Sequence, residues 1–304
     1  MWTIYSAGAR EIMTFEGKLY GIPLIAERFI LYYRKDLFEE QGIKVPETFE
    51  EMEAAAKQIQ EKNPGMVGIT SRGQQSPAVT AFSNYLHNFG GEFIIDGKAV
   101  LNTPESVAGF KFYGDMLRAY GPKGVVNMSW PEAAAVFSQG KAGMYTDADG
   151  IYNALIDPEK SVIAEKIGFA VFPKGPVNQA PYNVCSWALA IGANSAKKEV
   201  AWELIKWLTN KENSTHMLKS GITIARSTSW QDKDATSKLP PQLADVIVKS
   251  NEIGVGIDRP RVINVGEARD IVGAVIITAI EGKDVQAAAD KANAELQKLI
   301  DKEK

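Results

Sequence analysis

The stretch GKLYGIPLIAERFILYYRKDLF, Gly17 to Phe38, decides how the rest of the chain is arranged. Leu19 to Pro23 predicts a short apolar strand that ends at a proline, because proline lacks the N–H that a central strand donates. A charged pair, Glu27 and Arg28, precedes a second predicted strand, Phe29 to Tyr33. Two strands separated by charges rather than by a glycine-rich turn indicate a chain that passes from one sheet to another. We therefore expect the charged pair in a crevice between two bodies.

The composition is that of a globular protein with one large or two ordinary domains. The chain has 304 residues, of which 45% are hydrophobic and 23% charged. A net charge of −3 without a basic block gives no reason to expect a nucleic acid or an anionic membrane as partner. The longest apolar run, 271–280, falls short of the roughly 20 residues that a bilayer span needs. No signal peptide is recognised at the start of this chain.

Residues with catalytic or metal-binding potential are sparse. The two histidines, His87 and His216, each lie in a helical pattern, so no clustered metal ligands are predicted. Cys185 is the single cysteine, which excludes an internal disulfide, and its apolar strand favours a core position. The chain contains no phosphate-binding loop and no nucleophile elbow. We predict no cofactor, no metal and no enzymatic activity.

Strands alternate with helices along the chain, which is typical of α/β layers. Thr48 is expected to cap a helix to Asn63, and Ser195 a long helix through Leu218. Asp96-Gly97 suits the turn of a hairpin over Glu92 to Leu101. The other expected strands are 66–70, 143–146, 166–171 and 184–191, and the other expected helices are 78–89, a helix starting at Thr103-Pro104, 129–140, 241–251, 266–282 and 285–300.

Several segments together resemble one protein family. They are GKLYGIP with LYYRKDLF, AVFSQGKAGM at 135–144, AWELIKWLTNKEN at 201–213, and Gly282 before an alanine-rich helix. This order is similar to that of the extracellular (family 1) solute-binding proteins of ABC-type sugar importers, which include maltose-binding protein. The resemblance covers nearly the whole chain and is far more specific than any one of these motifs.

The resemblance implies an α/β, periplasmic-binding-protein-like (type II) fold of two lobes with a hinge. Residues 1–28 and 185–258 are expected to form what remains of lobe I, and residues 29–184 and 259–304 to form lobe II. Family members carry roughly a hundred residues, the size of a small domain, before the first quoted strand. Only 16 precede it here. The resemblance thus implies a fragment with an incomplete first lobe, for which we predict exposed sheet edges, weak ligand binding and self-association.

The implied function is the substrate-binding component of an ABC importer. The lobes would close on a small sugar or sugar alcohol and offer it to the transporter's permease subunits. The resemblance places the full-length protein in the periplasm or outside the cell, either lipid-anchored or free. Two alternatives stay open: a carbohydrate-acting enzyme that uses Asp147 and Asp149 as acid and nucleophile, and a binding protein that serves a sensor.

A sugar site needs carboxylates, amides and arginines for hydroxyl groups, and aromatic planes for ring faces. Glu27 matches a ligand glutamate of the family, although an ion pair with Arg28 is an alternative. Gly150-Ile151 stand where the family often has a tryptophan, which argues against a long oligosaccharide. Glu267 and Arg269 are interpreted as a charge pair at a helix start. The candidate ligand residues are Glu27, Arg72, Gln75, Trp130, Asp147, Tyr182, Asn183, Trp187 and Arg226.

Overall fold

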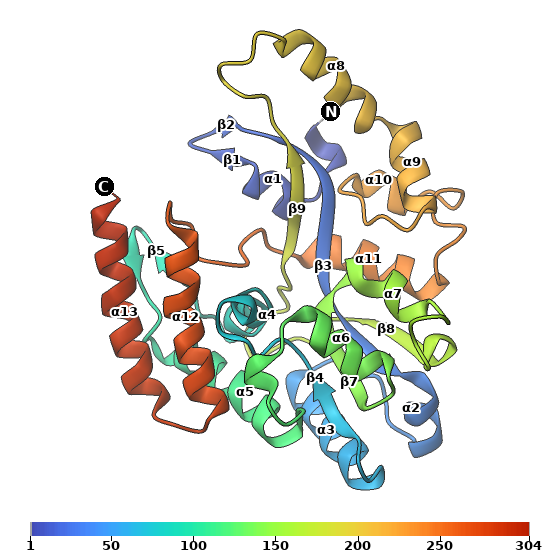
Figure 1. Cartoon of the computed structure of the whole chain (residues 1–304), viewed down its shortest axis with the longest axis vertical. Helices are drawn as coiled ribbons and strands as arrows, with labels where there is room; N and C mark the ends of the chain where they lie inside the picture. The colour runs from blue at the N-terminus through green and yellow to red at the C-terminus, as the bar shows by residue number, and fades with distance from the viewer. Residues whose placement is uncertain (1, 304) are drawn as a thin grey trace.

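One long strand runs through the whole molecule. The computed structural model describes the backbone of residues 2–303 and their side chains apart from those of residues 2 and 183–186 (Figure 1). Strand β3 (Ile22–Arg34) pairs antiparallel with β9 (Asn183–Leu189) along its first half. Its second half pairs with β7 (Ala142–Ala148) and β8 (Ile167–Val171) on either side. The change of sheet predicted at Glu27 and Arg28 is therefore confirmed.

The prediction of two separate strands in this stretch is wrong. Residues 22–34 form a single strand, and register irregularities against β9 between Pro23 and Glu27 absorb the passage. Leu19 belongs to a small separate hairpin of β1 (Thr14–Phe15) and β2 (Lys18–Leu19). The charged pair does not break β3, because Arg28 finds hydrogen-bond partners inside the protein.

The main sheet has the order β4–β7–β3–β8, with β4 (Val67–Thr70) parallel to β7. Alternate residues of β3 serve two hydrophobic cores, as the pleat of a strand requires. Phe29, Leu31 and Tyr33 pack in the larger core, and Ile30 and Tyr32 pack in the second. Both faces of the sheet are therefore covered, which explains why residues 29–34 are almost uniformly apolar.

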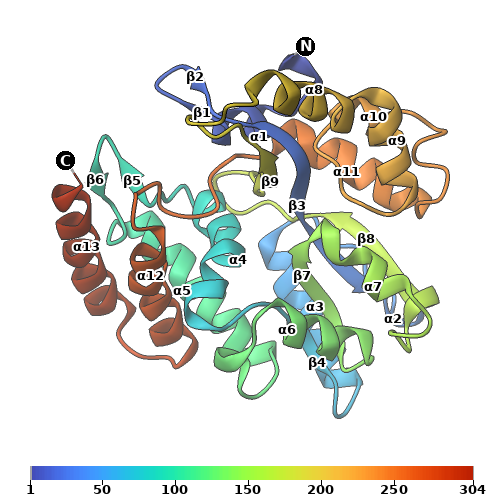
Figure 2. The same cartoon turned by 45° about the horizontal axis from the view of Figure 1, so that its top comes forward.

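Helices cover both faces (Figures 1 and 2). The larger core takes α3 (Phe49–Lys62), α4 (Gln75–Asn88), α5 (Pro104–Tyr120), α12 (Val265–Ile280) and α13 (Val285–Lys302). The second takes α6 (Trp130–Ser138), α7 (Tyr152–Ile156) and α11 (Pro241–Ile253). Because α11 packs on β8, apolar contact continues across the predicted lobe boundary at residue 184. The lobe boundaries themselves stay a prediction.

Capping residues, turn dipeptides and apolar periodicity in the sequence predicted most helices and strands correctly. Thr48 caps α3 by accepting from the Glu51 N–H at 3.2 Å. Asp96 and Gly97 have φ of 49° and 72° in the turn between β5 (Ile94–Ile95) and β6 (Lys98–Ala99). Three further short helices are α1 (Ala7–Ile12), α2 (Lys35–Gln41) and α10 (Ser227–Trp230), the last inside a stretch expected to be irregular.

The long helix expected from Ser195 to Leu218 is wrong. The segment forms two helices, α8 (Lys198–Leu208) and α9 (Lys211–Lys219). Asn210 starts α9, because its side chain accepts a hydrogen bond from the Asn213 N–H at 2.8 Å. An asparagine that caps the backbone in this way ends one helix and begins the next.

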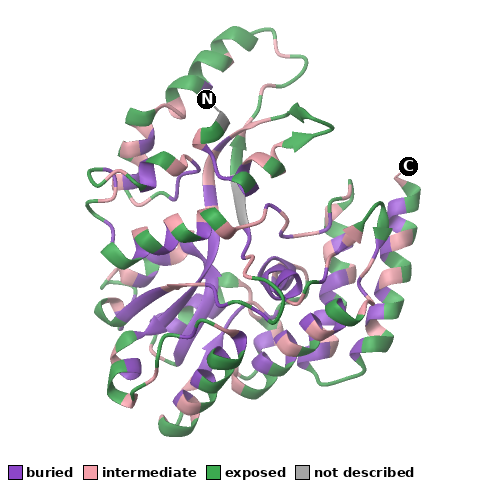
Figure 3. Ribbon diagram, turned by 180° about the vertical axis from the view of Figure 1, so that it is seen from behind, coloured by how far each residue is buried: buried purple, intermediate pink, exposed green. Residues whose placement is uncertain are grey.

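Helix α8 is amphipathic, yet its apolar side chains are largely exposed. Ile205 is the one residue of α8 that is buried among those the structure describes. Figure 1 shows α8 at the upper edge of the molecule, and Figure 3 shows most of it as exposed. A hollow of about 860 Å³ separates Trp202 from Leu19 and Ile22. The exposed apolar side chains of α8 are Val200, Trp202, Leu204 and Trp207.

We predict that this surface causes self-association, because contiguous exposed apolar patches bury themselves against other molecules. The double variant Val200→Glu, Leu204→Lys should lower the weight-average mass towards the 33.2 kDa monomer. Multi-angle light scattering over a concentration series measures this. Val162→Lys is a matched control, since Val162 is 69% exposed in another part of the molecule. An unmodified chain that stays monomeric at all concentrations would contradict the prediction.

Candidate functional site

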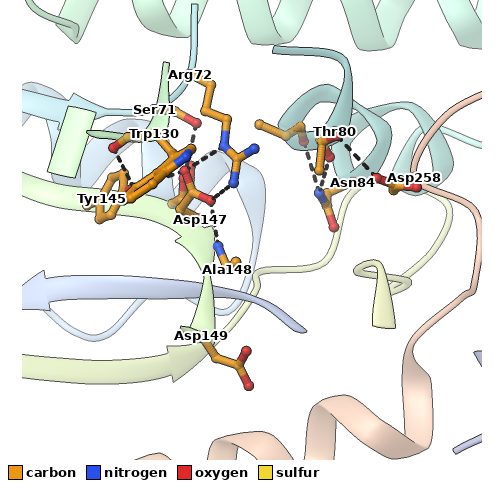
Figure 4. Close-up of polar contacts among 12 residues, drawn as sticks. Ser71, Arg72, Thr80, Asn84, Trp130, Tyr145, Asp147, Ala148, Asp149 and Asp258 are labelled. Atoms are coloured by element: carbon orange, nitrogen blue, oxygen red, sulfur yellow. Dashed lines mark hydrogen bonds and ion pairs between the residues drawn. The ribbon is translucent and has the colours of Figure 1, made fainter. Parts of the chain in front are cut away.

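Asp147 lies at the carboxyl end of β7 and is fully buried. Arg72 follows β4, which is the parallel neighbour of β7, so both residues emerge at the same edge of the sheet. The Arg72 Nε donates to Asp147 Oδ2 at 2.8 Å, and Nη2 donates to Oδ1 (Figure 4). This is the two-pronged geometry in which guanidinium binds carboxylate best.

Two further donors complete the surroundings of Asp147. The Tyr145 hydroxyl donates to Oδ2 at 2.9 Å, and the Ala148 N–H donates to Oδ1 at 2.7 Å. Four donors thus use the four acceptor positions of this carboxylate. Burial lowers the pKa of Arg72, but Asp147 outweighs it, and the pKa rises above its ordinary value. Arg72 is therefore a fixed cation held by an acceptor that is already saturated.

A second group of polar residues surrounds the middle of α4. The Thr80 hydroxyl donates to Asp258 Oδ2 at 3.1 Å, and the Arg259 Nε lies 2.9 Å from both oxygens of Asp258. Asn84 Oδ1 accepts from the Tyr182 N–H at 2.7 Å. In the view of Figure 4, Thr80 and Asn84 lie between the guanidinium of Arg72 and Asp258.

Tyr182 connects the two groups. Its ring is 1% exposed, and its hydroxyl has no hydrogen-bond partner among the residues that the structure describes. Burial, Glu27 and Asp147 raise the pKa of Tyr182, which Arg72 opposes. A buried hydroxyl without a partner costs free energy, so it marks a position where a bound group would be stabilised. We call Arg72, Asp147, Tyr182, Asp258 and Arg259 the charged site.

The sequence interpretation missed the role of Arg28. This side chain is fully buried, and its Nη1 donates to Asp149 Oδ2 at 2.8 Å. Its backbone N–H donates to Asp149 Oδ1 at 3.0 Å. Arg28 was considered only as a partner for Glu27. An arginine directly before a buried strand was the available signal, but its partner lies 121 residues away.

Glu27 instead lies against Gly150. A Cβ atom at residue 150 would stand 2.9 Å from Glu27 Oε1, so a larger residue there would displace this carboxylate. Burial raises the pKa of Asp149 to about 6, and the charge of Glu27 adds to this, whereas Arg28 opposes it.

Three other candidate residues, Trp130, Gln75 and Trp187, are exposed. Trp130 begins α6 and is 47% exposed, and its carbonyl oxygen lies 3.4 Å from the Tyr145 hydroxyl, whose hydrogen goes to Asp147. Gln75 is exposed and its amide donates to the Asp270 carbonyl at 3.0 Å. Trp187 lies opposite Ile25 on β9 and is 64% exposed. Its expected position at a crevice edge stays a prediction.

Two candidates are not brought to the charged site by the described contacts. Arg226 lines the hollow beneath α8 and donates to the Thr209 carbonyl at 3.3 Å. Asn183 pairs through its backbone with Arg28, and its side chain lies outside the described residues. The expected ion pair of Glu267 with Arg269 is absent among the described residues, where Glu267 accepts from the Asn264 amide at 2.7 Å.

The geometry does not favour a glycosidase. Asp147 and Asp149 point in different directions from the end of β7 (Figure 4). Each is held by its own arginine, so the two carboxyl groups do not face a common space as an acid and a nucleophile must. Among the residues whose side chains the structure describes, no group of three or more potential metal ligands occurs. Among those residues, no helix is long and apolar enough to cross a bilayer.

Comparison with known proteins decides the family. Residues 2–215 match the family model described as bacterial extracellular solute-binding protein. The chain belongs to this family. The resemblance found in the sequence is thereby confirmed.

Two relatives of this solute-binding protein are named for sugar alcohols that they bind. A mannitol-binding protein of Pseudomonas aeruginosa is 30% identical over 66% of this chain and 48% of its own length. An erythritol/L-threitol-binding protein of Mycolicibacterium smegmatis is 27% identical over 68% and 45%. The chain spans about half the length of these curated relatives.

Solved structures confirm the two-lobe fold. A ribitol complex from Agrobacterium radiobacter K84 has a TM-score of 0.85 at 30% identity, covering 98% of this chain and 76% of that one. A maltose-bound protein of T. maritima has a TM-score of 0.82 at 27% identity, with 98% and 77% covered. The first protein has ribitol bound and the second has maltose bound.

The raised pKa of Asp149 predicts a pH-dependent stability. Since the folded-state pKa of about 6 exceeds the ordinary 3.8, the protonated group favours the folded state. Its contribution is complete below about pH 4 and is lost as the pH rises through 6, a change of about 3 kcal/mol. Urea unfolding from pH 4 to 7 should show this fall in the unmodified protein and not in Asp149→Asn.

The matched control is Asp157→Asn, a carboxylate near the surface that pairs with Lys160. This variant should keep the pH dependence of the unmodified protein. Equal slopes in Asp149→Asn and in the unmodified protein would show that Asp149 does not titrate as stated.

Proposed function

We propose that the full-length protein is the substrate-binding component of an ABC importer, and that it binds a small sugar or sugar alcohol between its lobes. The observation that carries this proposal is the saturated Arg72–Asp147 pair beside the unpartnered hydroxyl of Tyr182. Polar groups that are fixed and removed from water form hydrogen bonds with ligand hydroxyl groups in defined directions. Such binding involves no chemical reaction. Family membership and the named ligands of relatives support the same function.

Roles for individual residues follow from their positions. Arg72 and Tyr182 would bind ligand hydroxyl groups, with Asp147 orienting Arg72. Glu27 would add a carboxylate on the crossing strand, and the half-exposed Trp130 a plane for the carbon chain. Gly150 and Ile151 supply no aromatic ring at the place where the family often has a tryptophan, which suits a small ligand better than a long oligosaccharide.

Hinge closure is the proposed mechanism. Ligand binding favours the closed form only if the ligand contacts both lobes, because equal affinity for both forms would shift nothing. Glu27 lies where β3 changes sheets, so a ligand that contacts both Glu27 and Arg72 would join the two bodies. The closed form would then be offered to permease subunits at the outer face of the membrane.

A thermal-shift screen tests the function. Ribitol, D-mannitol and maltose, each at millimolar concentration, should be compared, and at least one polyol should raise the melting temperature by mass action. Trp130→Ala should weaken that binding about tenfold, a loss of one aromatic contact worth about 1.4 kcal/mol. Trp207→Ala is the matched control, since Trp207 is 59% exposed on α8.

The proposal would be overturned if no sugar or sugar alcohol shifted the melting temperature at concentrations that saturate relatives. Hydrolysis of a chromogenic glycoside that disappears in Asp147→Asn would instead support the enzymatic alternative.

A further inference from the structure

A third arginine lies beside the charged site and has no carboxylate partner. Arg269 is partly buried in the first turns of α12, and its Nε donates to the Ser76 carbonyl at 3.1 Å. No described carboxylate lies within ion-pair distance of its guanidinium, in contrast to Arg72 with Asp147 and Arg259 with Asp258. The neighbouring Asp270 is exposed and makes no ion pair with it.

The three guanidinium groups are close enough to influence one another. Burial, followed by the charges of Arg259 and Arg72, lowers the pKa of Arg269, and Asp258 opposes this. Arg259 also bonds through Nη2 to the Thr80 hydroxyl at 3.4 Å, one turn along α4 from Ser76. Arg269 and Arg259 therefore flank the same part of α4, where Arg269 has no ion-pair partner among the described residues, although the charges of Asp258 and Asp270 act on it.

Several hydrogen-bond donors of the three arginines have no acceptor among the described residues. Arg72 and Arg259 each keep Nη1 without an acceptor among the described residues, and Arg269 keeps both Nη1 and Nη2. The Tyr182 hydroxyl is a further donor without a partner there. The acceptors within the charged site are largely used, since Asp147 accepts four hydrogen bonds and both oxygens of Asp258 bind Arg259. Glu27 on β3 is a further carboxylate that acts on Tyr182.

Arginine N–H groups without acceptors favour some polyhydroxylated ligands over others. A hydroxyl group carries one donor hydrogen and two acceptor lone pairs, so each hydroxyl of a neutral polyol that accepts from these arginines still needs an acceptor for its own hydrogen. A carboxylate accepts only, and it matches the paired N–H groups of guanidinium. In a sugar acid, a carboxylate replaces one terminal CH₂OH of the sugar alcohol. This carboxylate would accept hydrogen bonds from the unpaired N–H groups and form an ion pair with Arg269.

We propose that the ligand is a sugar acid, an open-chain polyhydroxylated carboxylate, whose carboxylate binds Arg269 and Arg259 while its hydroxyl groups bond to Arg72 and Tyr182. This inference rests on the proposed function, because it assumes that the charged site binds a small polyhydroxylated molecule. It goes further by assigning Arg269 as a specificity-determining residue.

Calorimetry with matched ligand pairs tests the inference on the full chain. D-ribonate is compared with ribitol, and D-mannonate with D-mannitol, so that each pair differs in one terminal group. The aldonate should bind at least tenfold more tightly than its alcohol at low ionic strength, and added salt should reduce this advantage. Ribitol 5-phosphate is a third probe for the charge of the anion.

Arg269→Gln should reduce ribonate affinity to that of ribitol and change ribitol affinity less than twofold. Arg269→Lys should recover part of the loss, because it restores the charge without the two-pronged geometry. Arg261→Gln is the matched control, since Arg261 is an exposed arginine paired with Glu11 in a nearby segment. It should leave both affinities unchanged, and all three variants should keep the melting temperature of the free protein.

Each contrary outcome is decisive. Ribitol binding as tightly as ribonate, or Arg269→Gln weakening both alike, overturns the sugar-acid inference and leaves the proposed function standing. Tighter binding of the phosphate than of the carboxylate overturns the choice of carboxylate. Absence of binding to all five probes overturns the sugar-acid inference for this chain, whereas the thermal-shift screen on the full-length protein decides the proposed function.

Discussion

The buried contacts of Arg28 are the constraint on which the junction between the two halves of this molecule depends. The guanidinium donates to Asp149, to the carbonyls of Ala26 and Ile224, and to the Asn251 side chain, at 2.6 to 3.1 Å. Its Cζ also stands 4.6 Å from the ring centre of Trp230. One side chain thereby joins β3 to the end of β7, to the segment before α10 and to α11. Removing it would leave several buried acceptors unpaired.

The arginine specifies arrangement more than it supplies stability. Burial raises the pKa of Asp149 even though Arg28 is its partner, so removing this carboxylate from water costs more than the ion pair returns. The pair is nevertheless satisfied only when four distant segments meet in one geometry. Such a requirement fixes how the crossing strand sits against α10 and α11, and with it the position of Glu27 on the same strand.

Local signals were readable from the sequence, whereas partners distant in sequence were not. The cap at Thr48, the turn at Asp96-Gly97 and the change of sheet at residue 27 follow from spacing and residue type. Arg72 and Asp147 were both recognised as ends of strands, but their pairing depends on β4 lying parallel to β7, a strand order that no local pattern reveals. Asn210 divided a helix because one side chain competes for the backbone. Arg269 was assigned to Glu267 for nearness in sequence, although α4 supplies its actual partner at Ser76.

The continuity of β3 limits how the two halves can move. A loop between lobes would let them rotate freely, but thirteen residues of hydrogen-bonded strand resist twisting and bend only where the ladder is already irregular, between Pro23 and Glu27. The strand is thus stiff along most of its length and bends most easily at the irregular stretch between Pro23 and Glu27. Opening and closing would then follow a single reproducible arc, and the side chains beside this stretch would be the ones whose spacing changes most.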